Sequence, residues 1–239
     1  MRDAQPTLAV VAPRRALSNL QAVHDAVVVC RRCPRLVEWR ERVGSEKRAA
    51  YRDEEYWARP VPGFGDLAAR VMVVGLAPAA HGGNRTGRMF TGDRSGDWLY
   101  RALHRAGFAN QPTSTAADDG LTLTDAYITA AVRCAPPDNR PTPQERDKCG
   151  PFLDRELALL DGVRVYIALG SFGYEALCRS LDVRPRPKFA HLAEVDTGGR
   201  TILCSYHPSQ QNTFTGRLTE SAFDAVFTRA RELTPNLRQ

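Results

Sequence analysis

The fold is decided by the stretch VMVVGLAPAAHGGNRTGRMFTGD, residues 71–93, in which a short apolar run leads into a long glycine-rich segment. Residues 71–75 are apolar at nearly every position, as expected for a strand of a parallel sheet covered on both faces. Five glycines and a proline in residues 75–93 prevent a regular element from continuing. The backbone therefore turns repeatedly just after a buried strand, where it can approach a ligand closely.

Three more short apolar segments follow, and stretches with helical periodicity separate them. The apolar segments are residues 126–132, 165–170 and 201–206. The helical stretches are residues 96–106, 142–160, 172–180 and 219–233, with another at 17–30. Alternation of this kind predicts βαβ units and an α/β fold, a three-layer α/β/α sandwich.

Local signals mark where the helices begin. Thr142 is followed by Pro143 and Glu145, a capping-box pattern. Ser171 and Thr219 are the predicted N-caps of the next two helices.

The bulk properties favour one domain. The chain has 239 residues, and we expect a single domain over residues 17–233 with tails at 1–16 and 234–239. The net charge of +6 fits either ordinary solubility or a polyanionic partner. Neither a membrane-spanning run nor a signal-peptide pattern is found, so the expected location is cytoplasmic.

The glycine-rich segment carries side chains suited to a planar, negatively charged ligand. They are an imidazole, two guanidinium groups, an aromatic ring and a carboxylate, from His81, Arg85, Arg88, Phe90 and Asp93. Ligands of open parallel sheets bind beyond the carboxyl ends of the strands. Residues 133–142 and 207–218 also follow predicted strands, so we expect these loops to meet the glycine-rich segment.

Four cysteines form two pairs, Cys30 with Cys33 and Cys134 with Cys149. Four thiolates suit either zinc or an iron–sulfur cluster, and the spacing does not separate the two; unrelated buried thiols are the third interpretation. The other two cysteines fit small core residues within a helix and a strand: Cys178 and Cys204.

Together these motifs resemble the family-5, or type b, uracil-DNA glycosylases of bacteria and archaea. The resemblance covers residues 30–218 and also rests on YITAAVRCAPPDNRPTP (127–143) and SYHPSQQNTFTGRL (205–218). It implies a central four-stranded parallel sheet and excision of uracil and, variably, hypoxanthine and ethenocytosine from DNA. It also implies a [4Fe-4S] cluster on four ligands: Cys30, Cys33, Cys134 and Cys149.

A glycosylase must extract its base from the DNA stack before cleaving the glycosidic bond. Phe90 is the expected stacking platform, and His207 the donor to the base oxygen as the base leaves. The simpler interpretations are a core phenylalanine and a histidine that merely ends a strand.

Two positions depart from the pattern of related families. Ala77 stands where these place an Asp or Asn that positions water, so Asp93 is the next candidate; an N-cap role is its alternative. Ala130 stands where they carry an Asn that binds the uracil edge, so Asn139 is the substitute; a turn-forming role is its alternative.

The remaining predicted contacts are less specific. Backbone groups near the base or the adjacent phosphate come from residues 75–78, namely Gly75, Ala77 and Pro78. Contacts with phosphate, or loop structure, are expected from His81, Asn84, Arg85 and Arg88. Residues along the DNA and at the gap left by the base are Ser209, Gln210, Gln211, Asn212 and Arg217.

The favoured hypothesis is a monomeric, monofunctional DNA glycosylase acting on double- or single-stranded DNA, because no lysine is clearly placed as a Schiff-base nucleophile. The alternative is a non-catalytic iron–sulfur protein that binds damaged DNA on the same fold. A phosphate-binding hydrolase is disfavoured, since the glycine-rich segment lacks the Lys-Ser/Thr ending of a P-loop.

Overall fold

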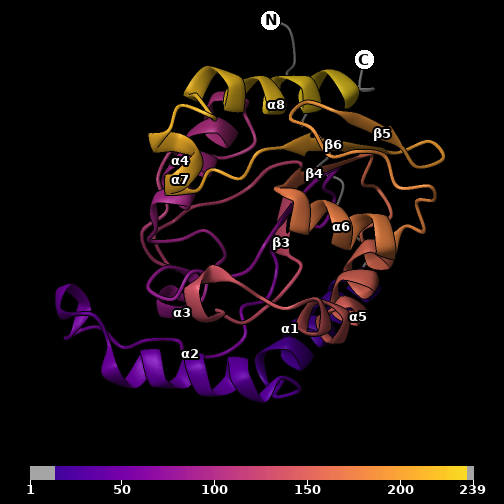
Figure 1. Cartoon of the computed structure of the whole chain (residues 1–239). Helices are drawn as coiled ribbons and strands as arrows, with labels where there is room; N and C mark the ends of the chain where they lie inside the picture. Colours follow the sequence, from indigo (N-terminus) through magenta and orange to yellow (C-terminus); the bar gives the residue numbers. More distant parts are fainter. Residues whose placement is uncertain (1–13, 236–239) are drawn as a thin grey trace, which may run out of the picture.

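A mixed sheet in the order β1-β3-β2-β4-β6-β5 forms the centre of the computed structural model, which describes residues 14–235 (Figure 1). Its strands are β1 Phe64–Gly65, β2 Val71–Gly75, β3 Ala126–Ala130, β4 Val165–Leu169, β5 Glu194–Asp196 and β6 Thr201–Ser205. The middle four, β3-β2-β4-β6, are parallel, and β1 and β5 pair antiparallel at the two edges.

The four parallel strands confirm the predicted central sheet, and two short edge strands extend it. The additional strands are two and three residues long, too short to produce a periodic pattern. Phe64 lies opposite Ile128, and Val195 lies opposite Ile202. Both edge strands exist because a neighbouring strand offers hydrogen-bonding groups, which the sequence alone does not reveal.

Helices cover both faces of the sheet, giving the predicted three layers (Figure 1). One face packs against α4 (Arg94–Arg105) and α8 (Glu220–Leu233). The other packs against α1 (Arg14–Val28), α5 (Pro143–Leu159) and α6 (Ser171–Ser180).

Alternation along each strand divides the core in two. Val71 and Val73 pack on the α4–α8 side, whereas Met72 and Val74 pack on the α1–α5–α6 side. All four side chains are fully buried. A strand apolar at every position is therefore the expected consequence of two covered faces.

Shorter elements surround the carboxyl ends of the parallel strands. They are α2 (Pro34–Glu46), the 3-10 helices η1 (Ala49–Tyr51) and η2 (Pro137–Asn139), α3 (Gly83–Thr86) and α7 (Gln210–Phe214). Of these elements, η1, η2 and α7 contribute residues to the lining of the cavity described below.

Two of the three predicted N-caps are confirmed. Thr142 and Glu145 form a complete capping box, and Thr219 accepts a hydrogen bond from the backbone N–H of Ala222. The prediction for Ser171 is wrong, because Gly170 is the N-cap and Ser171 is the first residue of α6. Gly170 has φ +84, a conformation that suits glycine at this sharp turn.

The predicted tails fall largely outside the described residues, which exclude 1–13 and 236–239. Helix α1 begins at Arg14, three residues before the predicted domain start. Within the described range, every helix is too short or too polar to span a bilayer.

Candidate active site

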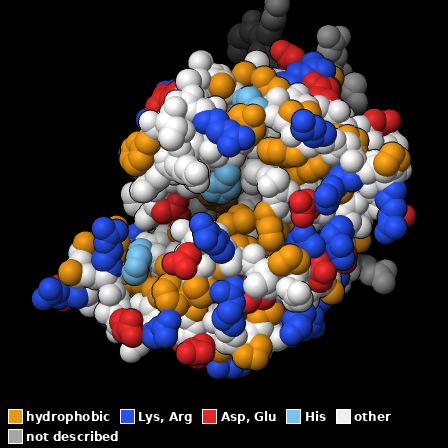
Figure 2. Space-filling model, viewed as in Figure 1, with side chains coloured by type: hydrophobic (Ala, Val, Ile, Leu, Met, Phe, Trp, Pro, Cys, Tyr) orange, Lys and Arg blue, Asp and Glu red, His pale blue; other side chains and the backbone are white. Residues whose placement is uncertain are grey.

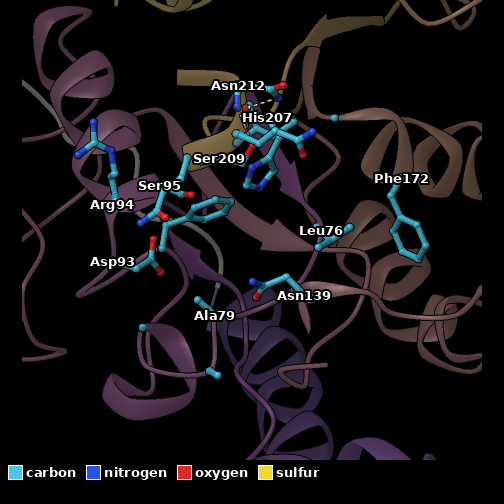
Figure 3. A pocket seen from close by; sticks show the side chains of 18 of the residues that line it. Leu76, Ala79, Asp93, Arg94, Ser95, Asn139, Phe172, His207, Ser209 and Asn212 are labelled. Carbon is cyan, nitrogen blue, oxygen red and sulfur yellow. Dashed lines mark hydrogen bonds between the residues drawn. The ribbon is translucent and has the colours of Figure 1, made fainter. Parts of the chain in front are cut away.

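A cavity of about 880 Å³ opens at the carboxyl ends of the parallel strands. Figure 2 shows the hollow in this face, with Lys and Arg side chains around its mouth. The structure brings the three predicted loops together here, since residues from the ends of β2, β3 and β6 all line the cavity (Figure 3). The end of β4, through Leu169 and Gly170, completes the wall.

Phe90 is held rigidly in the cavity wall. The residue has φ +54, uncommon for a bulky side chain, and its side chain is nearly buried. A Cβ at Gly75 would lie 2.5 Å from the Phe90 ring, and one at Gly96 would lie 1.7 Å from its carbonyl oxygen. Both glycines are therefore required for the ring to lie where it does. Such strain, held in place by its surroundings, is typical of a binding site.

His207 lies two residues after the end of β6 and faces Phe90, with ring centroids 6.1 Å apart and planes at 31°. Its backbone carbonyl accepts a hydrogen bond of 2.9 Å from the Asn212 side chain. Burial lowers the pKa of His207 to about 4. The imidazole is therefore neutral near pH 7 and keeps one N–H available as a donor.

Asp93 caps a helix and also lines the cavity, so its position is compatible with both of the roles considered for it. It is the N-cap of α4, and its Oδ1 accepts a 3.0 Å hydrogen bond from the backbone N–H of Gly96. The residue also lines the cavity, and burial raises the pKa of its carboxyl group above the ordinary value. Gly82 leaves room for the second oxygen, because a Cβ there would lie 2.1 Å from Oδ2.

Asn139 lies across the cavity from His207 (Figure 3). It has φ +54 and the preceding Asp138 has φ +53, so the turn-forming interpretation is also correct. The left-handed turn and the cavity-facing amide are compatible, because the turn fixes the backbone from which the side chain projects.

Among the predicted backbone contacts, only Ala77 lines the cavity. Gly75 lies beneath the Phe90 ring, and Pro78 is buried against Gly83. These two residues lie behind the cavity wall, and their contact with the base or the adjacent phosphate stays a prediction.

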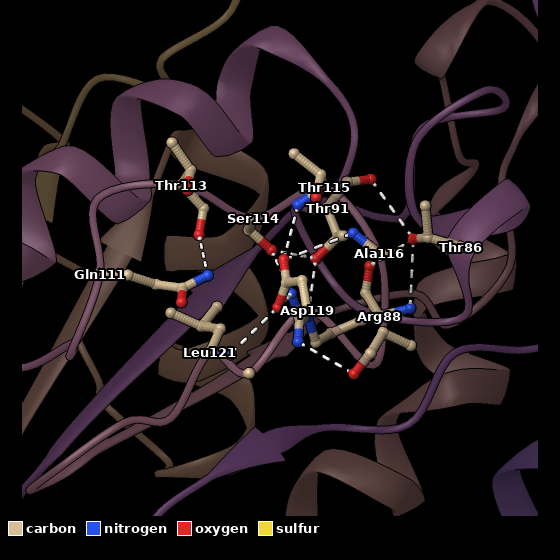
Figure 4. Close-up of polar contacts among 12 residues, drawn as sticks. Thr86, Arg88, Thr91, Gln111, Thr113, Ser114, Thr115, Ala116, Asp119 and Leu121 are labelled. Carbon is tan, nitrogen blue, oxygen red and sulfur yellow. Dashed lines mark hydrogen bonds and ion pairs between the residues drawn. The ribbon is translucent and has the colours of Figure 1, made fainter.

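Arg88 does not line the cavity, and its contacts favour the loop-structure alternative over the phosphate contact. Its side chain is 5% exposed, and it donates 2.7 Å hydrogen bonds to Asp119 and to Ser114 (Figure 4). It also donates to Thr91 and to the backbone of Ala117. The buried, ion-paired Arg88 guanidinium therefore stabilises the loop that carries it.

The contacts of Asn84 and Arg85 also favour the loop-structure alternative. Asn84 is fully buried and donates from its side chain to the carbonyl of Arg40, at 3.2 Å. Arg85 pairs with Glu54 and donates to the carbonyl of His81. Both side chains hold the glycine-rich segment together.

His81 does line the cavity, and its Nδ1 lies 3.0 Å from the Tyr56 hydroxyl. Burial, with help from Arg48 and Arg85, lowers the pKa of His81. This leaves the imidazole neutral near pH 7.

The segment after His207 forms part of the rim of the cavity. Ser209 caps α7 by accepting a hydrogen bond from the backbone N–H of Asn212. The other rim residues that line the cavity are Gln210, Gln211, Asn212 and Arg217. Arg217 is exposed and lies over the Tyr206 ring, 4.4 Å from its centroid.

All four paired cysteines line a second, smaller cavity between the start of α2, the end of β3 and α5. Burial raises the pKa of Cys134 to about 11 and that of Cys149 to about 12, so both are protonated unless a cation stabilises the thiolates. Cys178 and Cys204 lie apart from this group in the core, as predicted.

The surroundings of this second cavity suit an anionic group. Arg40 and Arg133 line it and are 2% and 1% exposed. Three of their N–H-bearing nitrogens are buried without a hydrogen-bond partner among the described residues: Arg40 Nε and Arg133 Nε and Nη1. Arg40 Nη1 donates to Cys134 Sγ at 2.9 Å. Over residues 14–235, no set of three or more His, Cys, Asp or Glu is close enough to hold one metal ion.

Comparison with known proteins agrees with this geometry. The uracil DNA glycosylase superfamily model matches residues 62–231. A type-5 uracil-DNA glycosylase of Thermus thermophilus is 53% identical over 215 residues, covering 89% of this chain and 97% of the relative. One from Mycobacterium tuberculosis is 54% identical over 212 residues, covering 87% and 79%. This chain belongs to the type-5 uracil-DNA glycosylase family. A type-4 uracil-DNA glycosylase of Thermotoga maritima is more distant, at 33% over 156 residues, covering 62% and 69%.

Sequence reasoning missed several residues of this type-5 glycosylase site. Arg48 and Tyr51 line the cavity from the segment that follows α2, and Phe189 from the segment before β5. Arg94 lies over Phe214, which is 68% exposed beside the mouth. The segments around Arg48, Tyr51 and Phe189 have no periodic pattern, and only tertiary packing brings them to the cavity. Of the missed residues, the aromatic Phe214 was the one that the sequence could have indicated, because it stands in a polar segment.

Proposed function

We propose that this protein hydrolyses the bond between uracil and deoxyribose in DNA and leaves an abasic site. The observation that carries the proposal is the convergence of Phe90, Asp93, Asn139 and His207 on one cavity. Phe90 supplies a face for a planar base, and stacking of this kind contributes about 1–3 kcal/mol. Extrusion of the base costs a few kcal/mol, which stacking in the cavity helps to offset.

The charges of the site match those of the reaction. As the C1′–N bond breaks, negative charge develops on the base and positive charge on the sugar. The neutral His207 donates a hydrogen bond to the base oxygen, and a preorganised donor of this kind accelerates such reactions about 10²–10³-fold. The Asp93 carboxylate stabilises the cationic sugar and holds the attacking water. The water oxygen then bonds to C1′ and keeps one proton as the new hydroxyl group, and its other proton goes to the released base.

We infer a broad substrate range that includes hypoxanthine and ethenocytosine. Ala77 and Ala130 remove two polar groups that would select uracil, and Asn139 approaches the base from a loop. The cavity of about 880 Å³ also exceeds what one pyrimidine fills.

In this proposal the DNA lies across the mouth of the cavity, with Arg48 on one side of it and helix α7 on the other. Arg48 and Arg217 contact phosphates, and Gln210 and Gln211 lie at the space left by the base. Phe214 is exposed enough to enter that space, as apolar wedges of DNA-bending proteins do. The enzyme acts as a monomer and cleaves only the glycosidic bond.

We propose a [4Fe-4S] cluster as the cofactor. Cys30, Cys33, Cys134 and Cys149 would hold it, and the buried guanidinium group of Arg40 provides positive charge beside an anionic thiolate cluster. Arg133 is paired with the buried Glu156 but still has two N–H-bearing nitrogens without a partner in the described part of the chain, from which such a cluster could accept. When bound, the group fastens the N-terminal arm to the sheet and has a structural role.

Release of free uracil from a duplex containing one U·G pair tests the proposal. Wild-type protein should release the base at a rate far above that of His207→Ala. Tight binding without release would instead support the alternative, an iron–sulfur protein that binds damaged DNA. A panel with hypoxanthine and ethenocytosine opposite each normal base then defines the range.

A further inference from the structure

Helix α2 starts at the cysteine site. Cys33 is its N-cap, and the Cys33 carbonyl accepts hydrogen bonds of 3.0 Å from the backbone N–H groups of Leu36 and Val37. A group bound by the cysteines therefore fixes the first turn of α2 directly.

Arg40, in the middle of α2, connects the cysteine site to the glycine-rich segment. Its guanidinium donates to Cys134 Sγ at 2.9 Å and to the Cys30 carbonyl at 3.2 Å. Its own backbone carbonyl accepts the 3.2 Å hydrogen bond from the Asn84 side chain. Asn84 is completely buried, and its backbone N–H donates to the Ala79 carbonyl at 3.0 Å. Two residues thus join the cysteines to the loop that carries Phe90 and Asp93.

Arg35, two residues after Cys33 in the first turn of α2, reaches the other wall of the cavity. Its guanidinium donates to the Arg140 carbonyl at 3.1 Å and forms two 2.8 Å hydrogen bonds with Glu145. Arg140 follows Asn139 directly, so this contact fixes the turn from which the Asn139 amide projects.

The geometry points to α2 as the element that transmits the state of the cysteine site to the base cavity, with Arg40 and Arg35 as positioning residues. One end of the helix is set by the cysteines, and its side contacts two loops that face the base. Filling the cysteine site orders both loops. Emptying it makes residues 79–93 and 136–142 more mobile under conditions in which the sheet stays folded. The catalytic consequence rests on the proposed function, but the coupling itself does not.

The test replaces Arg40 by methionine and compares it with Arg42→Met. Arg42 lies on the same helix, but it is exposed and stacks on Trp39. Hydrogen exchange by mass spectrometry, iron and sulfide content, unfolding midpoint and single-turnover uracil release are measured on each full-length protein. We expect exchange in residues 79–93 to accelerate about tenfold or more in Arg40→Met, because a charged hydrogen bond is lost, with the sheet unchanged. Uracil release should slow by a similar factor with KM nearly unchanged, and Arg42→Met should match wild type.

Arg40→Lys keeps the charge and one donor and should restore part of both effects. If Arg40→Met does not fold, Arg35→Met gives the same test through exchange in residues 136–142. A double-mutant cycle with Asn84→Leu should be strongly non-additive, because both residues lie on one path. Unchanged loop exchange in a folded Arg40→Met protein would overturn the inference, as would equal effects in Arg42→Met. If wild-type protein releases no uracil, the proposed function fails, while the exchange measurement still decides the coupling.

Discussion

The residues that line the cavity and the residues buried behind its wall include the same types, arginine and asparagine, but their roles differ. Arg217 and Arg48 lie at the mouth of the cavity, whereas Arg85 and Arg88 come from the glycine-rich segment and are buried in ion pairs. Asn139 projects into the cavity, whereas Asn84 is enclosed by backbone. The role of a polar residue in a motif therefore depends on where its interaction partners lie in the folded protein. Substitutions behind the wall should change stability, and those in the wall should change chemistry.

The largest effect is expected behind the wall. Arg88→Met leaves Asp119 and Ser114 without their partner in a buried site, and breaking a buried pair costs about 3–5 kcal/mol. Denaturant unfolding measures the loss, with Arg155→Met, an exposed arginine on α5 away from the cavity, as control. A loss below about 1 kcal/mol combined with weaker DNA binding would restore the phosphate-contact role.

His207→Ala should affect chemistry and leave the fold intact. Removing the donor should slow single-turnover uracil release about 10²–10³-fold, with stability changed by less than about 1 kcal/mol. His104→Ala, on the exposed side of α4, serves as control and should behave as wild type. Equal rates for the two variants would remove His207 from the mechanism.

Asp93→Asn separates the cap from the charge, because Asn caps helices as well as Asp does. Burial raises the pKa of Asp93, so the wild-type rate should fall as pH drops through a value above the usual range of a carboxyl group. The pKa of His207, about 4, lies low enough that its protonation contributes only near the acid end. The Asn variant should be about 100-fold slower and lose this pH limb, with an unchanged unfolding midpoint. A wild-type pH profile in the variant would leave capping as the only role.

Arg217→Ala should have the smallest effect. Loss of one phosphate contact should reduce the slope of log Kd against log salt by about 0.9, with little change in the rate at saturating enzyme. Arg105→Ala is the control, because Arg105 pairs with Asp224 on α8. An unaltered slope would place the DNA elsewhere on the surface.

The sequence predicted the features that arise from local patterns. The four parallel strands follow from short runs apolar at every position, and the capping box at Thr142 follows from residue types three apart. The meeting of three loops in one cavity follows from the rule that parallel strands end at one edge. His207 could be selected because it stands near the end of a predicted strand, and Phe90 because it is the aromatic side chain of the glycine-rich segment.

The remaining features depend on partners distant in the chain. Arg88 pairs with Asp119 and Arg85 with Glu54, and neither pairing leaves a pattern in the sequence. The same holds for Arg48 at the cavity mouth. The burial that decides each role is a property of the folded molecule.

A crystal structure of the Asp93→Asn variant bound to a duplex containing uracil tests the central claim most directly. We expect the extruded uracil to stack on Phe90, with a ring nitrogen of His207 about 3 Å from a base oxygen and the Asn139 amide at the base edge. A uracil that stays in the duplex or lies in another part of the protein would contradict it.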